Sequence, residues 1–264
     1  MEPSGRILDL VFIGDIVGRP GREAVQRVLD GFRREGYPDL VIANGENASG
    51  GFGLTRETYH ELLNMGISVI TLGNHAWDKR EIFDFIGESS QLVRPLNFPE
   101  GTPGSGWTLV PAAGGLVAVI NLMGRAFMGS LDCPFRAADR AIADISPETR
   151  VILVDIHAET TAEKVALAYY LDGRVSAVVG THTHVQTADE RILPGGTAFL
   201  TDAGMCGAID SVIGMKTELA IKKMLTQLPV RFEVAEGPGQ FNGVRFRVEA
   251  LTGRTIAVER LNYR

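Results

Sequence analysis

Four of the five histidines in this 264-residue chain lie in three short loops, each of which follows a run of β-forming apolar residues. The loops are Gly-Asn-His at 73–75, Asp-Ile-His at 155–157 and Gly-Thr-His-Thr-His at 180–184, and two further strand ends carry Gly-Asp at 14–15 and Asn-Gly-Glu-Asn at 44–47. Imidazoles, carboxylates and Asn amide oxygens, without thiolates, suit hard-to-borderline divalent metals. Because strand C-termini converge on one edge of an open α/β sheet, we expect these groups to meet. They are too many for one ion, which predicts a two-metal hydrolytic centre.

The strongest single signal is the pair His182 and His184. In a strand or extended turn their i, i+2 spacing places both side chains on the same face. Two histidines on one face of a strand end, with apolar residues behind them, are seldom core packing. His60 lies in the middle of a predicted helix beside Glu61 and is interpreted as a solvated surface residue.

The acidic loops supply candidate carboxylate ligands. Glu46 is surrounded by small residues that let the backbone approach a ligand closely. Its two oxygens could bridge two cations, and Asn47 offers a neutral carbonyl beside it. Taken alone, this loop is also compatible with a flexible surface turn, and Asp15 with a turn or cap residue.

Asn74 and His75 predict a ligand next to a proton donor. Asn74 can bind metal through its oxygen, while His75 faces the substrate as a general acid with Asp78 as its orienting partner. A lone histidine is otherwise most often a satisfied structural residue. Arg19 and Arg125 could each contact a phosphate, and a structural salt bridge is an equally good interpretation of both.

Composition and motifs exclude several classes of protein. A net charge of −6 argues against a large nucleic-acid or membrane footprint, which would need a basic excess. A small phosphate-bearing substrate stays compatible because metals can supply the positive charge. The sequence contains no P-loop, no GxGxxG after a strand, no HExxH and no GxSxG.

The cysteines and the N-terminus indicate the compartment. Cys133 and Cys206 are isolated, so neither a zinc ribbon nor a redox dithiol is predicted, and reduced thiols are typical of the cytosol. The N-terminus lacks the basic n-region and the cleavage site of a signal peptide. No stretch approaches the roughly 20 apolar residues of a membrane span. We therefore expect a cytoplasmic protein.

Periodicity predicts one α/β domain over residues 1–264, with βαβ units and largely parallel pairing. Strands are expected at 7–13, 39–43, 67–72, 116–122, 151–156, 175–179 and 197–201, with a terminal hairpin of 244–248 and 255–260. Helices are expected at 22–34, from the N-cap Thr55 to about 65, and at 79–86, 134–143 and 161–171. Residues 95–115, rich in Pro and Gly, are expected to form a loop within the domain.

Together, these motifs resemble the calcineurin-like metallophosphoesterases. The resemblance rests on Gly14-Asp15, Asn44-Gly45-Glu46-Asn47, Gly73-Asn74-His75, His157-Ala158-Glu159 and Gly180 to His184. Within that superfamily, Ile13 to Gly18, Gly45-Glu46-Asn47 and Asn121 to Arg125 are similar to the YmdB-type branch of bacterial 2′,3′-cyclic-nucleotide phosphodiesterases. The likeness extends along nearly the whole chain.

This resemblance implies a four-layer α/β/β/α sandwich with two metal ions, iron or manganese before zinc, at one edge. It implies one ion held by Asp15, Glu46, Asn47 and His184, and another held by Glu46, Asn74, His157 and His182. Glu46 would bridge the ions, and His75 would be the proton donor. Two departures from the wider superfamily leave the identity of the ions open: Val17 stands where a histidine is usual, and Glu46 where an aspartate is usual.

The function predicted from residues and resemblance is hydrolysis of 2′,3′-cyclic nucleotides. The resemblance implies cleavage of the 2′ ester to give the nucleoside 3′-phosphate; the residues do not choose between the two esters. Loops 50–53 and 123–130 could form a shallow mononucleotide site with Arg125 near the phosphate. A phosphomonoesterase or protein phosphatase is an alternative, as is a metal-binding regulator with vestigial hydrolysis. We expect no extended nucleic-acid partner and no membrane partner, and the sequence leaves a homo-oligomer open.

Overall fold

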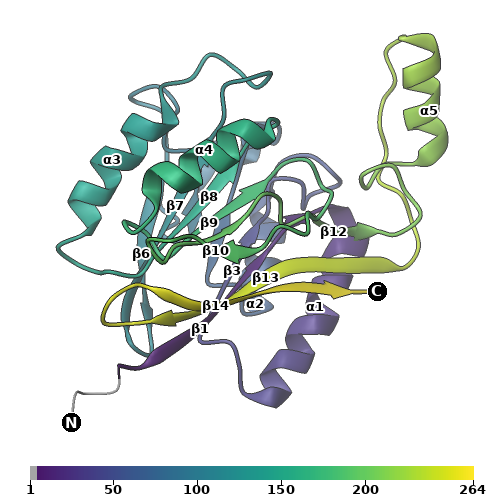
Figure 1. The fold of residues 1–264 in the computed structure, drawn as a ribbon. Coiled ribbons are helices and arrows are strands. Elements are labelled where there is room, and N and C mark those ends of the chain that lie inside the picture. Colours follow the sequence, from purple (N-terminus) through teal and green to yellow (C-terminus); the bar gives the residue numbers. More distant parts are fainter. Residues whose placement is uncertain (1–4) are drawn as a thin grey trace.

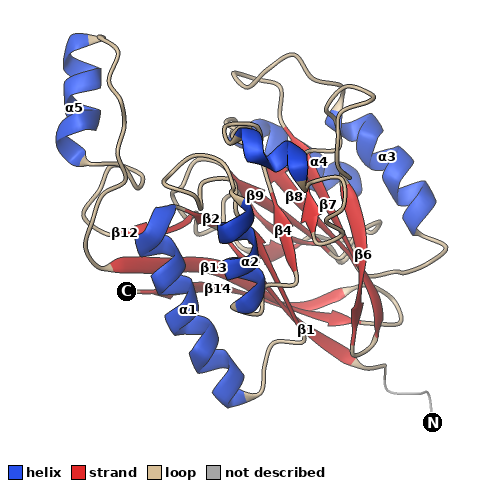
Figure 2. Ribbon diagram, turned by 180° about the vertical axis from the view of Figure 1, so that it is seen from behind, coloured by secondary structure: helices blue, strands red, loops and turns tan. Residues whose placement is uncertain are grey.

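Two β-sheets pack face to face (Figures 1 and 2), and the computed structural model describes residues 5–264. The first sheet has the order β2 (Asp15–Ile16), β12 (Met205–Ala208), β13 (Gly239–Glu249), β1 (Ile7–Ile13), β3 (Leu40–Asn44), β4 (Val69–Thr71) and β5 (Leu92–Val93), with β14 (Thr255–Tyr263) paired to β13. The second has the order β10 (Arg191–Ile192), β11 (Ala198–Leu200), β9 (Ala177–Thr181), β8 (Ile152–His157), β7 (Gly115–Met123) and β6 (Trp107–Ala112). Residues 1–4, which belong to the N-terminal segment on which the signal-peptide prediction rests, lie outside the described range.

Helices cover the outer face of each sheet, which confirms the predicted four-layer sandwich. The elements are α1 (Gly18–Glu35), α2 (Arg56–Asn64), the 3-10 helix η1 (Arg80–Asp84), α3 (Pro134–Ile145), α4 (Thr161–Leu171) and α5 (Thr217–Thr226). One apolar core joins α1 and α2 to the first sheet, a second fills the space between the sheets, and a third joins α3 and α4 to the second sheet. Three cores require four layers, because each layer interface buries its own apolar faces.

Parallel strands bring the predicted ligand loops to one edge of the sandwich. Strands β1, β3 and β4 are parallel neighbours, as are β8 and β9, so their carboxyl ends point the same way within each sheet. The prediction of largely parallel pairing fails on the other side of β1, where β13 runs antiparallel. The ligand loops thus come from two packed sheets and not from one open sheet.

Several predicted boundaries are wrong. Residues 95–115 are not all loop, since β6 occupies 107–112 as the antiparallel edge partner of β7. The first helix begins at Gly18, four residues before the expected start at residue 22.

Two other local predictions are confirmed. Thr55 is the N-cap of α2, and its side chain accepts a hydrogen bond from the backbone N–H of Thr58. The terminal hairpin of β13 and β14 is confirmed.

Residues 209–238 form an arm that carries α5 away from the sandwich (Figure 1). The arm leaves at the end of β12 and returns at the start of β13. Within α5 only Ala220 is buried, so this helix contributes little to any core. No helix in the described part of the chain is both long enough and apolar enough to span a membrane.

Candidate metal centre and cavity

The cluster is built around Nε2 of His157, at the end of β8. This nitrogen lies 2.9 Å from Oδ1 of Asn74, 3.1 Å from Oε1 of Glu46 and 3.1 Å from Nδ1 of His182. Ligand atoms of Glu46, His157 and His182 all lie within 4.8 Å of one another. The four residues predicted to share one metal ion are therefore brought together.

A second group adjoins the first through Glu46. Nε2 of His184 lies 3.2 Å from Nδ2 of Asn47 and 3.8 Å from Oδ1 of Asp15. The same Asn47 nitrogen lies 3.3 Å from Oε1 of Glu46. The residues predicted to hold the other ion are thus also adjacent, and Glu46 lies between the two groups.

Each of the three histidines directs one ring nitrogen into the cluster and has the other held by an outer partner. Nδ1 of His157 contacts the Thr181 hydroxyl at 2.9 Å, Nε2 of His182 contacts a Glu159 carboxylate oxygen at 3.0 Å, and Nδ1 of His184 contacts the backbone carbonyl of Ile213 at 2.9 Å. Glu159 and the Ile213 carbonyl are acceptors, and the Thr181 hydroxyl donates its own proton to Asp155. With the outer nitrogens carrying the protons of neutral imidazoles, each inner nitrogen could offer a lone pair to a metal ion, as metal-binding histidines do.

The cluster contains buried carboxylates whose negative charge a bound cation would neutralise. Asp15, Glu46 and His157 are at most 1% exposed. Burial raises the pKa of Asp15, and its Oδ1 has no hydrogen-bond partner among residues 5–264. Burial alone would also raise the pKa of Glu46, but the neighbouring His157 lowers it to about 2. Burial would lower the pKa of His157, yet Glu46 and Asp15 raise it to about 9. Without a metal ion, His157 therefore carries a second ring proton that balances part of the carboxylate charge, and a bound cation would displace that proton.

Backbone geometry lets the ligands approach. A Cβ on Gly73 would lie 2.4 Å from the His157 ring and 2.5 Å from the Glu46 carboxylate, so only glycine fits. His182 and His184 have φ angles of 100° and 65°, in a turn after β9. The expectation that an extended backbone places them on one face is wrong, because this left-handed turn directs them to different groups of the cluster.

His75 lies on the rim with the predicted partner. Its Nδ1 is 2.8 Å from Oδ2 of Asp78, and its backbone N–H donates to Oε2 of Glu46 at 2.8 Å. The ring meets Phe52 edge-on, with 5.1 Å between centroids. The Asp78 contact occupies Nδ1 and leaves Nε2 free for a substrate.

A buried polar network below His157 was missed by the sequence reasoning. Asp155 accepts hydrogen bonds from Thr181 at 2.7 Å and Thr71 at 2.6 Å, and lies 3.3 Å from the Asn44 amide nitrogen. Burial raises the pKa of Asp155 to about 6, against the lowering effect of His157. A charged residue inside the apolar run 151–156 was the available signal, since a buried carboxylate needs partners.

A cavity of about 400 Å³ opens over the cluster. Its lining falls into two sets, one from the strand-end loops and one from the arm: Glu46, Asn47, Gly51, Phe52, His75, Glu159, His182, Thr183 and His184, then Val212, Ile213, Met215, Ala220, Lys223, Met224 and Phe232. Loop 123–130 is not part of this lining. Arg125 is exposed, and its backbone N–H is held by Glu163 of α4, so its phosphate contact stays a prediction. Arg19 pairs with Glu23.

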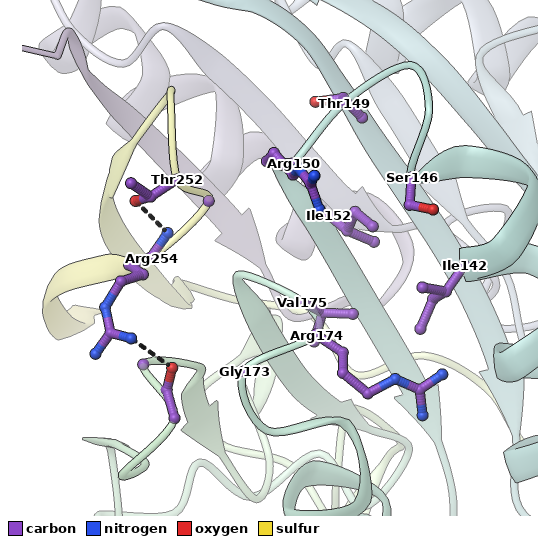
Figure 3. A pocket seen from close by; sticks show the side chains of 13 residues that line it. Ile142, Ser146, Thr149, Arg150, Ile152, Gly173, Arg174, Val175, Thr252 and Arg254 are labelled. Atoms are coloured by element: carbon purple, nitrogen blue, oxygen red, sulfur yellow. Dashed lines mark hydrogen bonds between the residues drawn. The ribbon is translucent and has the colours of Figure 1, made fainter.

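A second hollow, of about 260 Å³, lies near the amino ends of β8 and β9 (Figure 3). Arg150, Arg174 and Arg254 surround it, and Arg254 donates to the Gly195 carbonyl at 3.0 Å. The lining residues that the structure describes include no histidine, cysteine or carboxylate. This hollow therefore lacks the donors that hydrolytic metal chemistry needs.

Comparison with known proteins identifies the family of the chain. The model of the YmdB-like proteins matches residues 11–261. The chain belongs to the YmdB-like family. It is 53% identical over 252 residues, 96% of each chain, to a Bacillus subtilis (strain 168) protein named 2′,3′-cyclic-nucleotide 2′-phosphodiesterase.

Two solved structures of relatives share the fold over nearly their whole length. A hypothetical protein from Thermus thermophilus superposes with a TM-score of 0.91 at 44% identity, covering 97% of this chain and 99% of its own. A structure described as a novel phosphatase from Mycoplasma pneumoniae also gives 0.91, at 34% identity, covering 98% and 94%. The two-sheet arrangement that positions the cluster is thus common to these relatives.

Proposed function

We propose that this protein hydrolyses nucleoside 2′,3′-cyclic phosphates to nucleoside 3′-phosphates at a binuclear metal centre. The observation that carries the proposal is the convergence of one ring nitrogen from each of three histidines and of two buried carboxylates in two adjoining groups. The name of the Bacillus subtilis relative supports the choice of substrate and ester.

The donor set fits two ions of iron, manganese or zinc. Asp15, Asn47 and His184 would hold one, and Asn74, His157 and His182 the other, with Glu46 shared. When bound, such ions lower the pKa of a coordinated water and neutralise phosphoryl oxygens. Oδ1 of Asp15, which has no hydrogen-bond partner among the described residues, is the group that this role would satisfy.

His75 would donate a proton to the leaving ester oxygen. Nδ1 of the ring is fixed by Asp78, so Nε2 is the atom that delivers the proton. A positioned acid of this kind contributes typically about 10²–10⁴-fold to the rate. The five-membered cyclic phosphate is strained and needs little further help.

Product chromatography tests the substrate and the ester together. The purified protein is given a panel of 2′,3′-cyclic nucleotides, and the product is compared with authentic 2′- and 3′-monophosphates. We expect the 3′-phosphate. A predominant 2′-phosphate would overturn the choice of ester, whereas turnover of p-nitrophenyl phosphate without any cyclic-nucleotide turnover would favour a monoesterase.

The partner and the compartment complete the proposal. Acidic net charge offers little grip on a long polyanion, whose binding rests on several Lys/Arg–phosphate contacts, so we expect single cyclic nucleotides to be preferred over RNA. The two cysteines are free, as reduced cytoplasmic thiols would be. The protein would therefore act on small molecules in the cytoplasm.

A further inference from the structure

The cavity over the metal centre has a chemically distinct second wall. On the arm side it is formed mainly by apolar side chains, among them Met215, Met224 and Phe232, and Phe52 of the strand-end loops adds an aromatic ring beside His75. The strand-end side carries the imidazoles and carboxylates. With metal ions bound at the cluster, a ligand that has a phosphate at one end and an apolar body at the other would match both walls.

We propose that the arm seats the nucleobase of the substrate, and that Met224 is a specificity-determining residue for nucleotides over simpler phosphate esters. This inference rests on the proposed function, because it assumes that the phosphate lies at the metal cluster. Bases stack on aromatic rings such as Phe52, worth about 1–3 kcal/mol per base. Methionine thioethers also make favourable contacts with aromatic rings.

The arm is tied to the centre at its base. The Ile213 carbonyl accepts a hydrogen bond from Nδ1 of His184, and Met215 packs with Val17 and Met205 in a small apolar cluster that Phe52 and Phe232 adjoin. The two walls thus belong to one continuous site. A volume of about 400 Å³ is in the range of small-molecule sites, roughly 300–1,000 Å³. A single nucleotide is the occupant that matches both the phosphate-binding end and the apolar end.

Residues Met224 and Leu225 form a matched pair for the test. They are neighbours on α5 and are 69% and 80% exposed, but only Met224 lines the cavity. Alanine favours helix, so neither Met224→Ala nor Leu225→Ala should disturb α5. Thermal melting of both variants checks this point.

The experiment compares two substrates with the same five-membered cyclic phosphate, adenosine 2′,3′-cyclic phosphate and the base-free glycerol 1,2-cyclic phosphate. We expect the native protein to prefer the nucleotide by at least tenfold in kcat/KM. In Met224→Ala this preference should fall about fivefold, chiefly through KM for the nucleotide, since about 1 kcal/mol of apolar contact is lost. In Leu225→Ala the preference should be unchanged.

Three outcomes would overturn the inference: equal kcat/KM of the native protein for both substrates, an unchanged preference in Met224→Ala, or the same loss in Leu225→Ala. Each of these leaves the proposed function standing, because cyclic phosphates are still hydrolysed. Failure to hydrolyse either substrate, in protein with full metal content, would instead overturn the proposed function and this inference with it.

Discussion

The two walls of the cavity differ in how firmly the fold holds them. On the strand-end side, Asp15, Glu46, Asn47 and His157 are no more than 2% exposed and lie where parallel strands of two packed sheets end. On the arm side, α5 buries only Ala220, and Met224 and Leu225 are mostly exposed. Regions with few buried apolar contacts open at low free-energy cost. The comparison suggests that chemistry is placed on the rigid side and substrate selection on the side that can adjust.

Glu46→Ala should have the largest effect on the strand-end side of the cavity, because both groups of predicted metal ligands share this residue. We expect metal content, measured by elemental analysis of protein purified without chelator, to fall from two equivalents to near zero. Removing a hydrogen-bond partner of a metal ligand typically lowers metal affinity or activity about 10–100-fold, and the loss of activity in Glu46→Ala should be larger than this. Asp15→Ala is the matched variant and should mainly lose one equivalent. A native value of one equivalent or fewer in metal-supplemented protein would contradict the binuclear centre.

His75→Ala separates proton donation from assembly of the centre. Turnover of a cyclic nucleotide should fall about 10²–10⁴-fold while the metal content is kept, since His75 touches Glu46 only through its backbone N–H. The loss should be smaller for a p-nitrophenyl ester, whose leaving group needs no proton. Equal losses on both substrates, or loss of metal, would show that His75 is not the acid.

Thr181→Val tests whether the network below His157 positions that ligand. Valine keeps the shape but removes the hydroxyl that joins Nδ1 of His157 to Asp155. We expect metal affinity or activity to drop by about 10–100-fold. Thr181→Ser, which restores the hydroxyl, should recover most of the loss in a chelator titration; a serine variant as weak as the valine variant would contradict the positioning role.

The sequence predicted the rigid side better than the arm for a physical reason. Apolar runs followed by His, Asn, Asp or Glu mark strand ends, and parallel strands align their ends, so separate motifs could be assigned to one edge. The two-residue strands β2, β5 and β10 have no such periodicity, and β6 is hidden by Pro111 and the glycines around it. Their place depends on pairing with strands that are distant in sequence.

The arm illustrates what periodicity does not reveal. Strand β12 is a four-residue segment beside β13. Helix α5 buries only Ala220, so it lacks the apolar face that a helix packed on a core shows in its sequence. The carbonyl of Ile213, which holds His184, is a backbone group and carries no side-chain signal at all. Asp155 did leave a signal, as a carboxylate within an apolar strand, but its partners come from two different sheets.

Cysteine labelling measures how firmly the arm is held where it joins the sandwich, and gives the smallest expected effect. Cys206 lies in β12, directly before the arm, and burial raises the pKa of its thiol to about 12. Its Sγ donates to the Asn242 carbonyl at 3.3 Å. Because the thiolate is the reactive form, Cys206 should resist iodoacetamide at neutral pH, while the half-buried Cys133 is labelled first.

A Cys133→Ser variant isolates Cys206 and makes the measurement quantitative by mass spectrometry. We expect almost no label on the native variant and complete label in denaturant. Protection of Cys206 together with proteolytic cleavage within the arm would place the flexible point beyond β12, within residues 209–238. If Cys206 of the folded variant were labelled as fast as Cys133 of the unmutated protein, β12 itself would open, and the flexible part of the molecule would include an edge strand of the first sheet.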